Sequence, residues 1–306
     1  MAIIIRMNCF SEKDYSFLEF MNTLAESFRT QGRLRTAETY RSTMKSFRRF
    51  LNGEDINMSE ICPELMMQYE GHLRKQGLTL NTVSFYMRIL RASYNRCVEE
   101  GLCVQCHPFQ EVYTGVDKTR KRAISQNQVS KIKNAPLDDT PSICFARDMF
   151  MFSLYTRGMS FVDMAYLRKK DVSDGMLVYR RKKTGQLLTV KWEKCMQTIT
   201  DKYSIASSPY LLPLIKHSGD ERKQYLSALR QVNNNLKLLS AKIGCDNLTT
   251  YVARHTWASL AHSKNIPISL ISEGMGHTSE STTRVYLQSL DTSLINKMNK
   301  KIIEDL

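Results

Sequence analysis

Long apolar runs are missing from this chain of 306 residues. No stretch reaches the roughly 18–20 residues that a membrane-spanning helix requires. The opening segment from Met1 to Arg6 has three isoleucines followed by a charge, so it is too short for a signal peptide and is more typical of a short strand or arm. Internal repeats and low-complexity stretches are not evident either. The sequence therefore predicts a cytoplasmic protein of about two domains without a membrane partner.

A disulfide framework is also missing. The eight cysteines are scattered over a long chain, which favours reduced thiols. Cys103, Cys106 and His107 match the attachment pattern of a c-type haem, with Cys97 nearby as a further metal ligand. A haem site requires an exported protein, and a zinc site requires a second ligand pair that this sequence does not offer. We therefore expect neither metal nor cofactor, and we assign these cysteines to buried or linker thiols.

Acidic residues are few relative to basic ones: 30 Asp+Glu stand against 44 Lys+Arg, which gives a net charge of +14. Residues 1–116 are nearly neutral, with 14 Lys+Arg and 13 Asp+Glu, so the remaining 190 residues contain 30 and 17. A basic excess confined to one segment indicates a polyanion-binding surface, most often for nucleic acid. The alternative is a solubilising surface without a specific partner, and charge alone does not decide between them.

The first hundred residues predict a helical bundle. Between residues 11 and 101, apolar residues recur at helical spacing in four segments that are separated by short connections. The residues expected to cap or begin these helices are Ser11, Thr36, Pro63 and Thr79. We assign this amino-terminal helical domain to residues 1–106.

Periodicity is lost over residues 107–124, which we interpret as an interdomain linker. Its basic run, Lys118 to Arg122, is expected either to lie against a phosphate backbone or to form a solvated tether. The second domain, residues 125–306, is again mostly helical and includes an apolar helix over 141–158. Residues 175–190 interrupt it and predict two strands joined at Thr184-Gly185. Further helices are expected near 192 and over 219–243, 249–264, 267–274, 279–288 and 291–303.

The fold class is therefore mainly α with a small β-hairpin. Within it, Arg254, His277 and Tyr286 fall inside 33 residues. A phenolic oxygen can attack a phosphate while arginines carry the growing negative charge and an imidazole positions or relays a proton. Tyr251, Arg254 and His255 are spaced to share one helix face, as an oxyanion cradle or as a surface helix with an ion pair. The structural alternatives make His277 a capping residue and Tyr286 a core aromatic.

Taken together, these segments resemble the tyrosine recombinase family, also called phage integrases. The matching motifs are Tyr251 to Ala258, Met275-Gly276-His277, and Tyr286 nine residues after the histidine. The strand pair with Lys183-Thr184-Gly185 matches the lysine hairpin of the family. The resemblance covers about residues 11–303, because the helical domain looks like the family's SAM-like core-binding domain.

The resemblance implies a definite chemistry. Tyr286 would attack a scissile phosphodiester, form a 3′-phosphotyrosine bond and release a 5′ hydroxyl. Lys183 would be the general acid, Arg254 would bind the non-bridging oxygens, and His277 would hydrogen-bond the same phosphate with His255 in support. Because the phosphotyrosine conserves bond energy, religation would need neither ATP nor metal.

Two positions depart from the family pattern. Tyr251 stands where a histidine is usual, and a phenol is a poorer proton shuttle at neutral pH. Ser160 stands where the first arginine is expected. Two substitutes are available: Arg157, one helical turn before Ser160, and Arg181, on the same strand face as Lys183. The sequence leaves both open.

We therefore expect a site-specific recombinase of a mobile element that acts on double-stranded DNA. The resemblance implies a tetramer of two dimers, and it admits accessory DNA-bending proteins as partners. A segment from 291 to 306 would form a last helix that docks on a neighbouring subunit or packs on its own. Because no arm-binding domain precedes residue 11, we favour an invertase or resolvase-like enzyme over an integrase that needs arm sites.

Two rival functions fit parts of the sequence. A DNA-binding protein that kept the fold and lost catalysis would explain Ser160 and Tyr251, although a decayed enzyme would not be expected to keep Tyr286, Lys183, Arg254 and His277 together. A type IB topoisomerase would use the same chemistry without exchanging partners. The compact helical amino-terminal domain argues against it.

Overall fold

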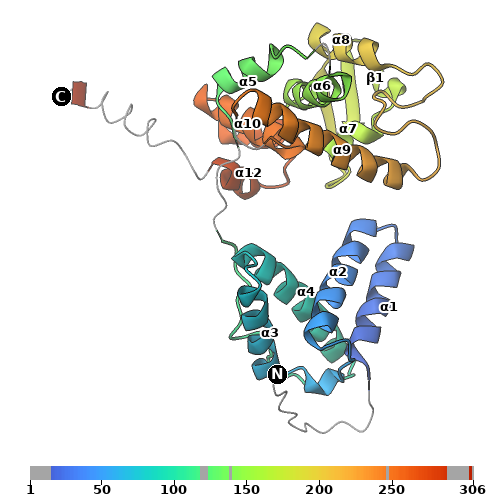
Figure 1. The fold of residues 1–306 in the computed structure, drawn as a ribbon, viewed down its shortest axis with the longest axis vertical. Coiled ribbons are helices and arrows are strands. Elements are labelled where there is room, and N and C mark those ends of the chain that lie inside the picture. Colours follow the sequence, from blue (N-terminus) through green and yellow to red (C-terminus); the bar gives the residue numbers. More distant parts are fainter. Residues whose placement is uncertain (1–14, 118–122, 138–139, 246–247, 288–302, 305–306) are drawn as a thin grey trace. The chain divides into compact units, whose positions relative to one another are not determined.

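The computed structural model describes residues 15–117, 123–137, 140–245, 248–287 and 303–304; for 285–287 the description is limited to the helix. The chain divides into two compact units, Met1–Thr119 and Arg120–Leu306 (Figure 1). No helix among the described residues is long and apolar enough to cross a membrane. The fold is mainly α with one small sheet, as the sequence predicts.

The amino-terminal unit is a four-helix bundle in which α1 packs along α2 (Figure 1). Its helices are α1 (Phe17–Thr30), α2 (Leu34–Phe50), α3 (Pro63–Lys75) and α4 (Leu80–Glu99), with a short 3₁₀ turn η1 (Met58–Glu60). Pro63 and Thr79 begin or cap their helices as predicted. The described first helix is capped by Ser16, whose Oγ accepts the Glu19 N–H at 2.8 Å; Ser11, the predicted cap, lies outside the described residues.

An aromatic cluster forms the centre of this bundle. The Phe47 ring lies 5.0 Å from the Tyr69 ring and 6.3 Å from that of Phe17, and all three side chains are fully buried. The Tyr69 hydroxyl donates to Ser46 at 2.8 Å, so its one polar atom is satisfied inside the core.

Residues 107–117, which the sequence assigns to a linker, pack on the amino-terminal unit. Phe109 and Val112 belong to its core, and the Ser84 hydroxyl donates to the Gly115 carbonyl at 2.6 Å. Asn81 exchanges two hydrogen bonds with the Asp117 backbone. The loss of helical periodicity therefore marks an irregular segment of turns and bends, which side-chain hydrogen bonds from α4 hold in place.

The carboxy-terminal unit surrounds one apolar helix, α6, with a small sheet and further helices. Its sheet is antiparallel in the order β1-β2-β3, with Leu177 opposite Val190 and Tyr179 opposite Leu188 on the buried face. The predicted hairpin is confirmed, and β1 is an addition that the sequence did not indicate. The elements are α5 (Gln126–Lys133), α6 (Pro141–Tyr155), α7 (Phe161–Tyr166), η2 (Lys169–Asp171), β1 (Val172–Ser173), β2 (Met176–Arg180), β3 (Leu187–Lys191), α8 (Lys194–Tyr203), α9 (Glu221–Lys242), α10 (Thr250–Ser263), α11 (Ile268–Gly274) and α12 (Glu280–Leu287).

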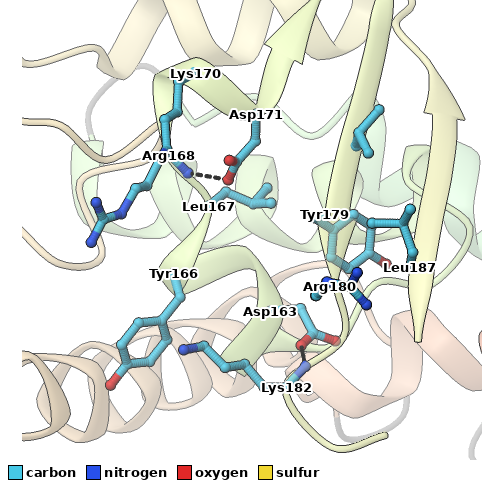
Figure 2. Close-up of a pocket in the computed structure, with 11 residues that line it drawn as sticks. Asp163, Tyr166, Leu167, Arg168, Lys170, Asp171, Tyr179, Arg180, Lys182 and Leu187 are labelled. Atoms are coloured by element: carbon cyan, nitrogen blue, oxygen red, sulfur yellow. Dashed lines mark hydrogen bonds between the residues drawn. The ribbon is translucent and has the colours of Figure 1, made fainter. Parts of the chain in front are cut away.

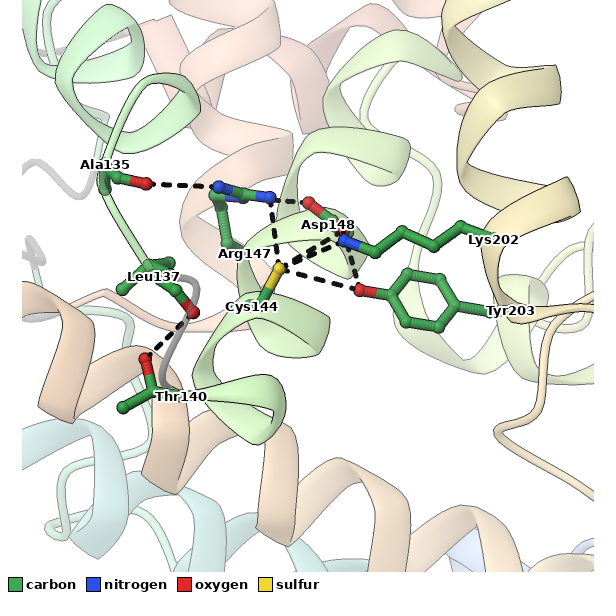
Figure 3. Close-up of polar contacts among 8 residues, drawn as sticks. All are labelled: Ala135, Leu137, Thr140, Cys144, Arg147, Asp148, Lys202 and Tyr203. Atoms are coloured by element: carbon green, nitrogen blue, oxygen red, sulfur yellow. Dashed lines mark hydrogen bonds and ion pairs between the residues drawn. The ribbon is translucent and has the colours of Figure 1, made fainter.

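A polar cluster fixes α6 against α8 (Figure 3). The buried Asp148 carboxylate accepts hydrogen bonds from Arg147 at 2.8 Å, Lys202 at 2.9 Å and Tyr203 at 2.7 Å. Burial raises the pKa of Asp148, but the three donors outweigh it and hold the pKa below its ordinary value. Arg147 also donates to the Ala135 carbonyl at 3.2 Å, which ties in the segment that follows α5.

We predict that Asp148→Ala destabilises the carboxy-terminal unit by about 3 kcal/mol, because the charges of Arg147 and Lys202 lose their common partner. This is the low end for breaking a buried ion pair, since the Lys202 side chain is 45% exposed. Both tryptophans, Trp192 and Trp257, lie in this unit, so their fluorescence during urea unfolding reports its stability. Asp201→Ala, an exposed change on the same α8, should cost less than about 1 kcal/mol; equal losses would contradict the role of the cluster.

Candidate active site

Arg254 is the buried centre of the predicted site. It lies in α10 and is 3% exposed. Nη1 donates to the Gly158 carbonyl and Nη2 to the Met275 carbonyl, both at 2.7 Å. These two carbonyls belong to the turn after α6 and the turn after α11, which lie far apart in sequence. One guanidinium therefore joins three segments of the chain.

Gly158 allows the first of these turns to approach α10 closely. Its φ is +70°, and a Cβ there would lie 2.9 Å from the Arg254 Cα and 3.2 Å from its Cγ. No residue with a side chain fits without displacing the α10 backbone. The start of α10 is held as well, because Asn233 of α9 accepts the Thr250 N–H at 2.9 Å.

His277 follows the second turn and contacts the same guanidinium. Its Nε2 lies 2.9 Å from Arg254 Nη2. An arginine can only donate, so Nε2 must accept, and the proton is on Nδ1, which lies 2.7 Å from the Thr283 hydroxyl. Burial, together with the charges of Arg254, Arg181 and Lys183, lowers the pKa of His277 to about 4. The imidazole is therefore neutral at neutral pH.

Thr283 connects this histidine to the helix that contains the predicted nucleophile. It is fully buried in α12, which packs against α10 and α11. Tyr286 lies in the same helix three residues later; its side chain is outside the described part of the structure. The sequence reading missed Thr283, although its place between His277 and Tyr286 was the available signal.

The hairpin loop brings Arg181 and Lys183 to this cluster. Arg181 is 6% exposed and its Nη1 donates to the Gly276 carbonyl, next to His277. Lys183 is exposed, and its charge is one of those that lower the pKa of His277. The expectation that both lie on one strand face is wrong, because β2 ends at Arg180 and the two residues belong to the loop.

The two positions around the missing arginine also differ from expectation. Helix α6 ends at Tyr155, and Arg157 has a φ of +60°, so Arg157 does not precede Ser160 by one helical turn. Its Cδ lies 3.7 Å from where a Cβ on Gly274 would be. Ser160 is the N-cap of α7.

Tyr251 and His255 form a pair near the start of α10. Their rings are 4.7 Å apart and nearly perpendicular, as an i, i+4 pair allows. Tyr251 is 42% exposed, whereas Arg254 is buried, so the phenol has a different environment from the guanidinium.

In the described part of the chain, no three His, Cys, Asp or Glu side chains are grouped so that they could hold a metal ion. Cys106, in the haem-like motif, donates to the Ile61 carbonyl and lies 3.2 Å from the Tyr94 hydroxyl. A cavity of about 370 Å³ lies beside the hairpin (Figure 2). Its lining contains two carboxylates, Asp163 and Asp171, and four basic residues, which are Arg168, Lys170, Arg180 and Lys182.

Comparison with known proteins assigns this chain to a family. The phage integrase SAM-like domain matches residues 16–112, and the phage integrase family matches residues 122–293. The second match covers more than half of the chain. The chain belongs to the phage integrase family of tyrosine recombinases.

Among similar proteins, tyrosine recombinase XerA of Thermococcus kodakarensis is 25% identical over 291 residues, which cover 93% of this chain and 98% of XerA. A lambda integrase dimer bound to a COC′ core site superimposes with a TM-score of 0.70 at 16% identity, over 91% of this chain and 79% of that one. A lambda integrase tetramer bound to a Holliday junction gives 0.68 at 16% identity, over 90% and 78%. At such identities the two structures establish the fold.

We predict that Gly158→Ala destabilises the carboxy-terminal unit more than Gly175→Ala. Both glycines have φ near +70°, so both substitutions cost about 1–2 kcal/mol for the left-handed backbone. Only the Gly158 methyl meets the Arg254 backbone, which adds about 1–3 kcal/mol of overpacking, whereas nothing lies within 4 Å of a Cβ on Gly175. Urea unfolding monitored by tryptophan fluorescence measures both. Equal losses would show that Gly158 is not needed for the contact.

The lowered pKa of His277 predicts a pH-dependent stability. Between pH 6.5 and about 4 the unfolded chain binds a proton at His277 that the folded chain does not. Stability must therefore fall as the pH falls through this range, by up to about 1.4 kcal/mol per pH unit for this proton. His277→Gln should remove this component, so the wild-type minus variant difference in unfolding free energy should decrease towards pH 4. A difference that is constant with pH contradicts the assignment.

Proposed function

We propose that this protein is a site-specific DNA recombinase that cleaves and rejoins double-stranded DNA through a 3′-phosphotyrosine intermediate. Membership of the phage integrase family supports a DNA recombinase, and the similar XerA protein carries the name tyrosine recombinase. The lambda integrase structures of the same fold are bound to a core site and to a Holliday junction. The proposal includes integration, excision and inversion, which share this cleavage step.

One observation carries the proposal: Arg254 is a buried arginine with no carboxylate partner among the described residues, and its helix α10 packs against α12, which contains Tyr286. The described partners of Arg254 are two carbonyls and the neutral His277, and its buried Nε has no hydrogen-bond partner among the described residues. Removing a positive charge from water is costly unless an anion compensates it. A phosphodiester would supply that anion and would accept from the guanidinium.

The proposed reaction is an in-line transfer at phosphorus. The phenolic oxygen of Tyr286 forms a bond to phosphorus while the bond to the 5′ oxygen of the leaving strand breaks. Lys183 gives its proton to that oxygen, a contribution typically of about 10²–10⁴-fold. Arg254 holds the non-bridging oxygens as negative charge grows in the transition state.

The role that we propose for His277 differs from the one that the resemblance implies, which is to donate a hydrogen bond to the phosphate. Its Nε2 accepts from Arg254 and its Nδ1–H points to Thr283, so both ring nitrogens are engaged in hydrogen bonds. We propose that the neutral ring orients Arg254, and that the proton of the Tyr286 phenol passes to solvent water. Religation runs the same steps in reverse, with a 5′ hydroxyl of another strand as the attacking group. The phosphotyrosine conserves the bond energy, so the proposal includes neither ATP nor metal.

The partners follow from charge and fold. The basic excess after residue 116 would bind the phosphate backbone, and the nearly neutral helical unit would add fewer phosphate contacts. We propose a tetramer of two dimers on two DNA sites; the lambda integrase tetramer bound to a Holliday junction supports the tetrameric assembly.

We predict that Tyr286→Phe abolishes covalent attachment to DNA and leaves DNA binding intact. The probe is a duplex that the wild-type chain selects from a random DNA pool, nicked near the point of cleavage so that the released fragment diffuses away. The covalent complex is measured by denaturing electrophoresis. Tyr155→Phe is the matched control and should form the complex as the wild type does, since Tyr155 lies at the end of α6.

Two outcomes would contradict the proposal. A covalent complex that persists in Tyr286→Phe would place the nucleophile elsewhere. A wild-type chain that binds the duplex and never attaches to it would favour the rival function, a DNA-binding protein that has lost catalysis.

A further inference from the structure

Ser160 has a structural task that no arginine could perform at that position. It precedes α7 with extended backbone angles, φ −69° and ψ 148°, and caps the helix by accepting the Asp163 N–H at 3.4 Å. Its hydroxyl also donates to Asp163 Oδ2 at 2.6 Å. Ser160 and Asp163 are thus hydrogen-bonded to each other. The positive charge of the arginine that the family pattern places at position 160 must therefore come from another element.

Asp163 connects this pair to the hairpin loop. It is 4% exposed, and its Oδ1 accepts the Lys182 N–H at 2.7 Å (Figure 2). The Nε of Arg181 lies 4.0 Å from Oδ2, and the two side chains are 7% and 1% exposed. A buried carboxylate is strongly attracted to an adjacent buried guanidinium. Asp163 therefore holds both the loop backbone and the Arg181 side chain.

Gly276 leaves the space in which the Arg181 side chain packs. Its φ is +66°, and a Cβ there would lie 3.1 Å from the Arg181 Cδ and 2.9 Å from the Leu188 Cδ1. The glycine thus lets the hairpin pack directly on the turn before His277, where Arg181 donates to the Gly276 carbonyl. Arg181 donates to the Gly276 carbonyl and Arg254 to the Met275 carbonyl, so the two guanidinium groups contact adjacent residues of the turn before His277.

Arg157 lacks these features. Its Cδ lies near Gly274, and close to the same glycine is the ring of Trp257. The charges of Arg157, Arg181 and Arg254 each oppose the rise that burial causes in the pKa of Tyr179, so charge alone does not separate the two candidates. The hairpin arginine is favoured because Asp163 and the Gly276 carbonyl hold its buried guanidinium next to His277.

We infer that Arg181 is the second phosphate-binding arginine of this enzyme and that Asp163 is the residue that positions it. This inference rests on the proposed DNA cleavage. The two guanidinium groups, one from α10 and one from the hairpin, flank His277 and share the negative charge of the pentavalent phosphate. Arg181 lies two residues before Lys183, so one hairpin loop supplies both the second arginine and the proposed general acid.

The test uses the full chain and the nicked duplex described above, at saturating DNA. Arg181→Ala should slow formation of the covalent complex by about 10²–10³-fold, the usual effect of losing one transition-state donor. Arg157→Ala and Arg180→Ala should react at the wild-type rate. Arg180→Ala is the matched control because it removes the same charge from the adjacent hairpin position. If Arg157→Ala shows the loss and Arg181→Ala does not, the inference is wrong.

Chemical rescue separates a missing charge from a damaged fold. Adding methylguanidinium should increase the rate at which Arg181→Ala forms the covalent complex by about tenfold or more. The reason is that the small cation can occupy the space of the deleted side chain. It should not restore Tyr286→Phe. An Arg181→Ala variant that binds DNA with wild-type affinity and shows no rescue would contradict a role at the phosphate.

The positioning role of Asp163 is tested by coupling. Asp163→Asn retains the size and the acceptor for Lys182 but removes the charge opposite Arg181. We expect about tenfold slower cleavage with unchanged DNA affinity, and no further loss when Asp163→Asn is added to Arg181→Ala. Losses that multiply would show that Asp163 acts independently of Arg181. A wild-type chain that forms no covalent complex would refute the proposed function itself. This result is seen before any variant is compared, so it can be told apart from a failure of the inference about Arg181 and Asp163.

Discussion

The contact between Arg254 and its two backbone carbonyls is the constraint on which the site depends. It joins the turn after α6, the helix α10 and the turn after α11, and it leaves the guanidinium next to His277. A buried arginine that is held by neutral groups retains its full positive charge for an external anion. The same contact also requires Gly158, since the turn approaches the Arg254 backbone too closely for a side chain.

The other site residues are attached to this centre by single, identifiable contacts. Thr283 links α12 to His277, so the helix that contains Tyr286 is oriented by the same imidazole that contacts Arg254. Asp163 links the hairpin loop to the start of α7. The proposed catalytic groups therefore come from two helices, one loop and one turn. Buried polar contacts set their geometry, which is the condition for preorganised electrostatics.

Sequence reasoning predicted the elements well and the geometry of the site only in part. Helical periodicity, Pro63, Thr79 and the two-strand pattern indicated their elements within a few residues, because they depend on local preferences. The contacts that fix Arg181 depend on Gly276 and Asp163, which are distant in sequence and carry no local signal. The prediction that Arg157 lies one helical turn before Ser160 was wrong, because α6 ends at Tyr155 and the following Arg157 and Gly158 have positive φ angles. The tautomer of His277 could be assigned only once its two partners were known.

The central claim is that Tyr286 becomes covalently joined to a 3′ phosphate of DNA. Mass spectrometry of the tryptic digest of the isolated covalent complex tests it most directly. The account predicts a nucleotide attached through its 3′ phosphate within the peptide from Val285 to Lys297, with the modification on Tyr286. An adduct on another residue, or one attached through a 5′ phosphate, would contradict it.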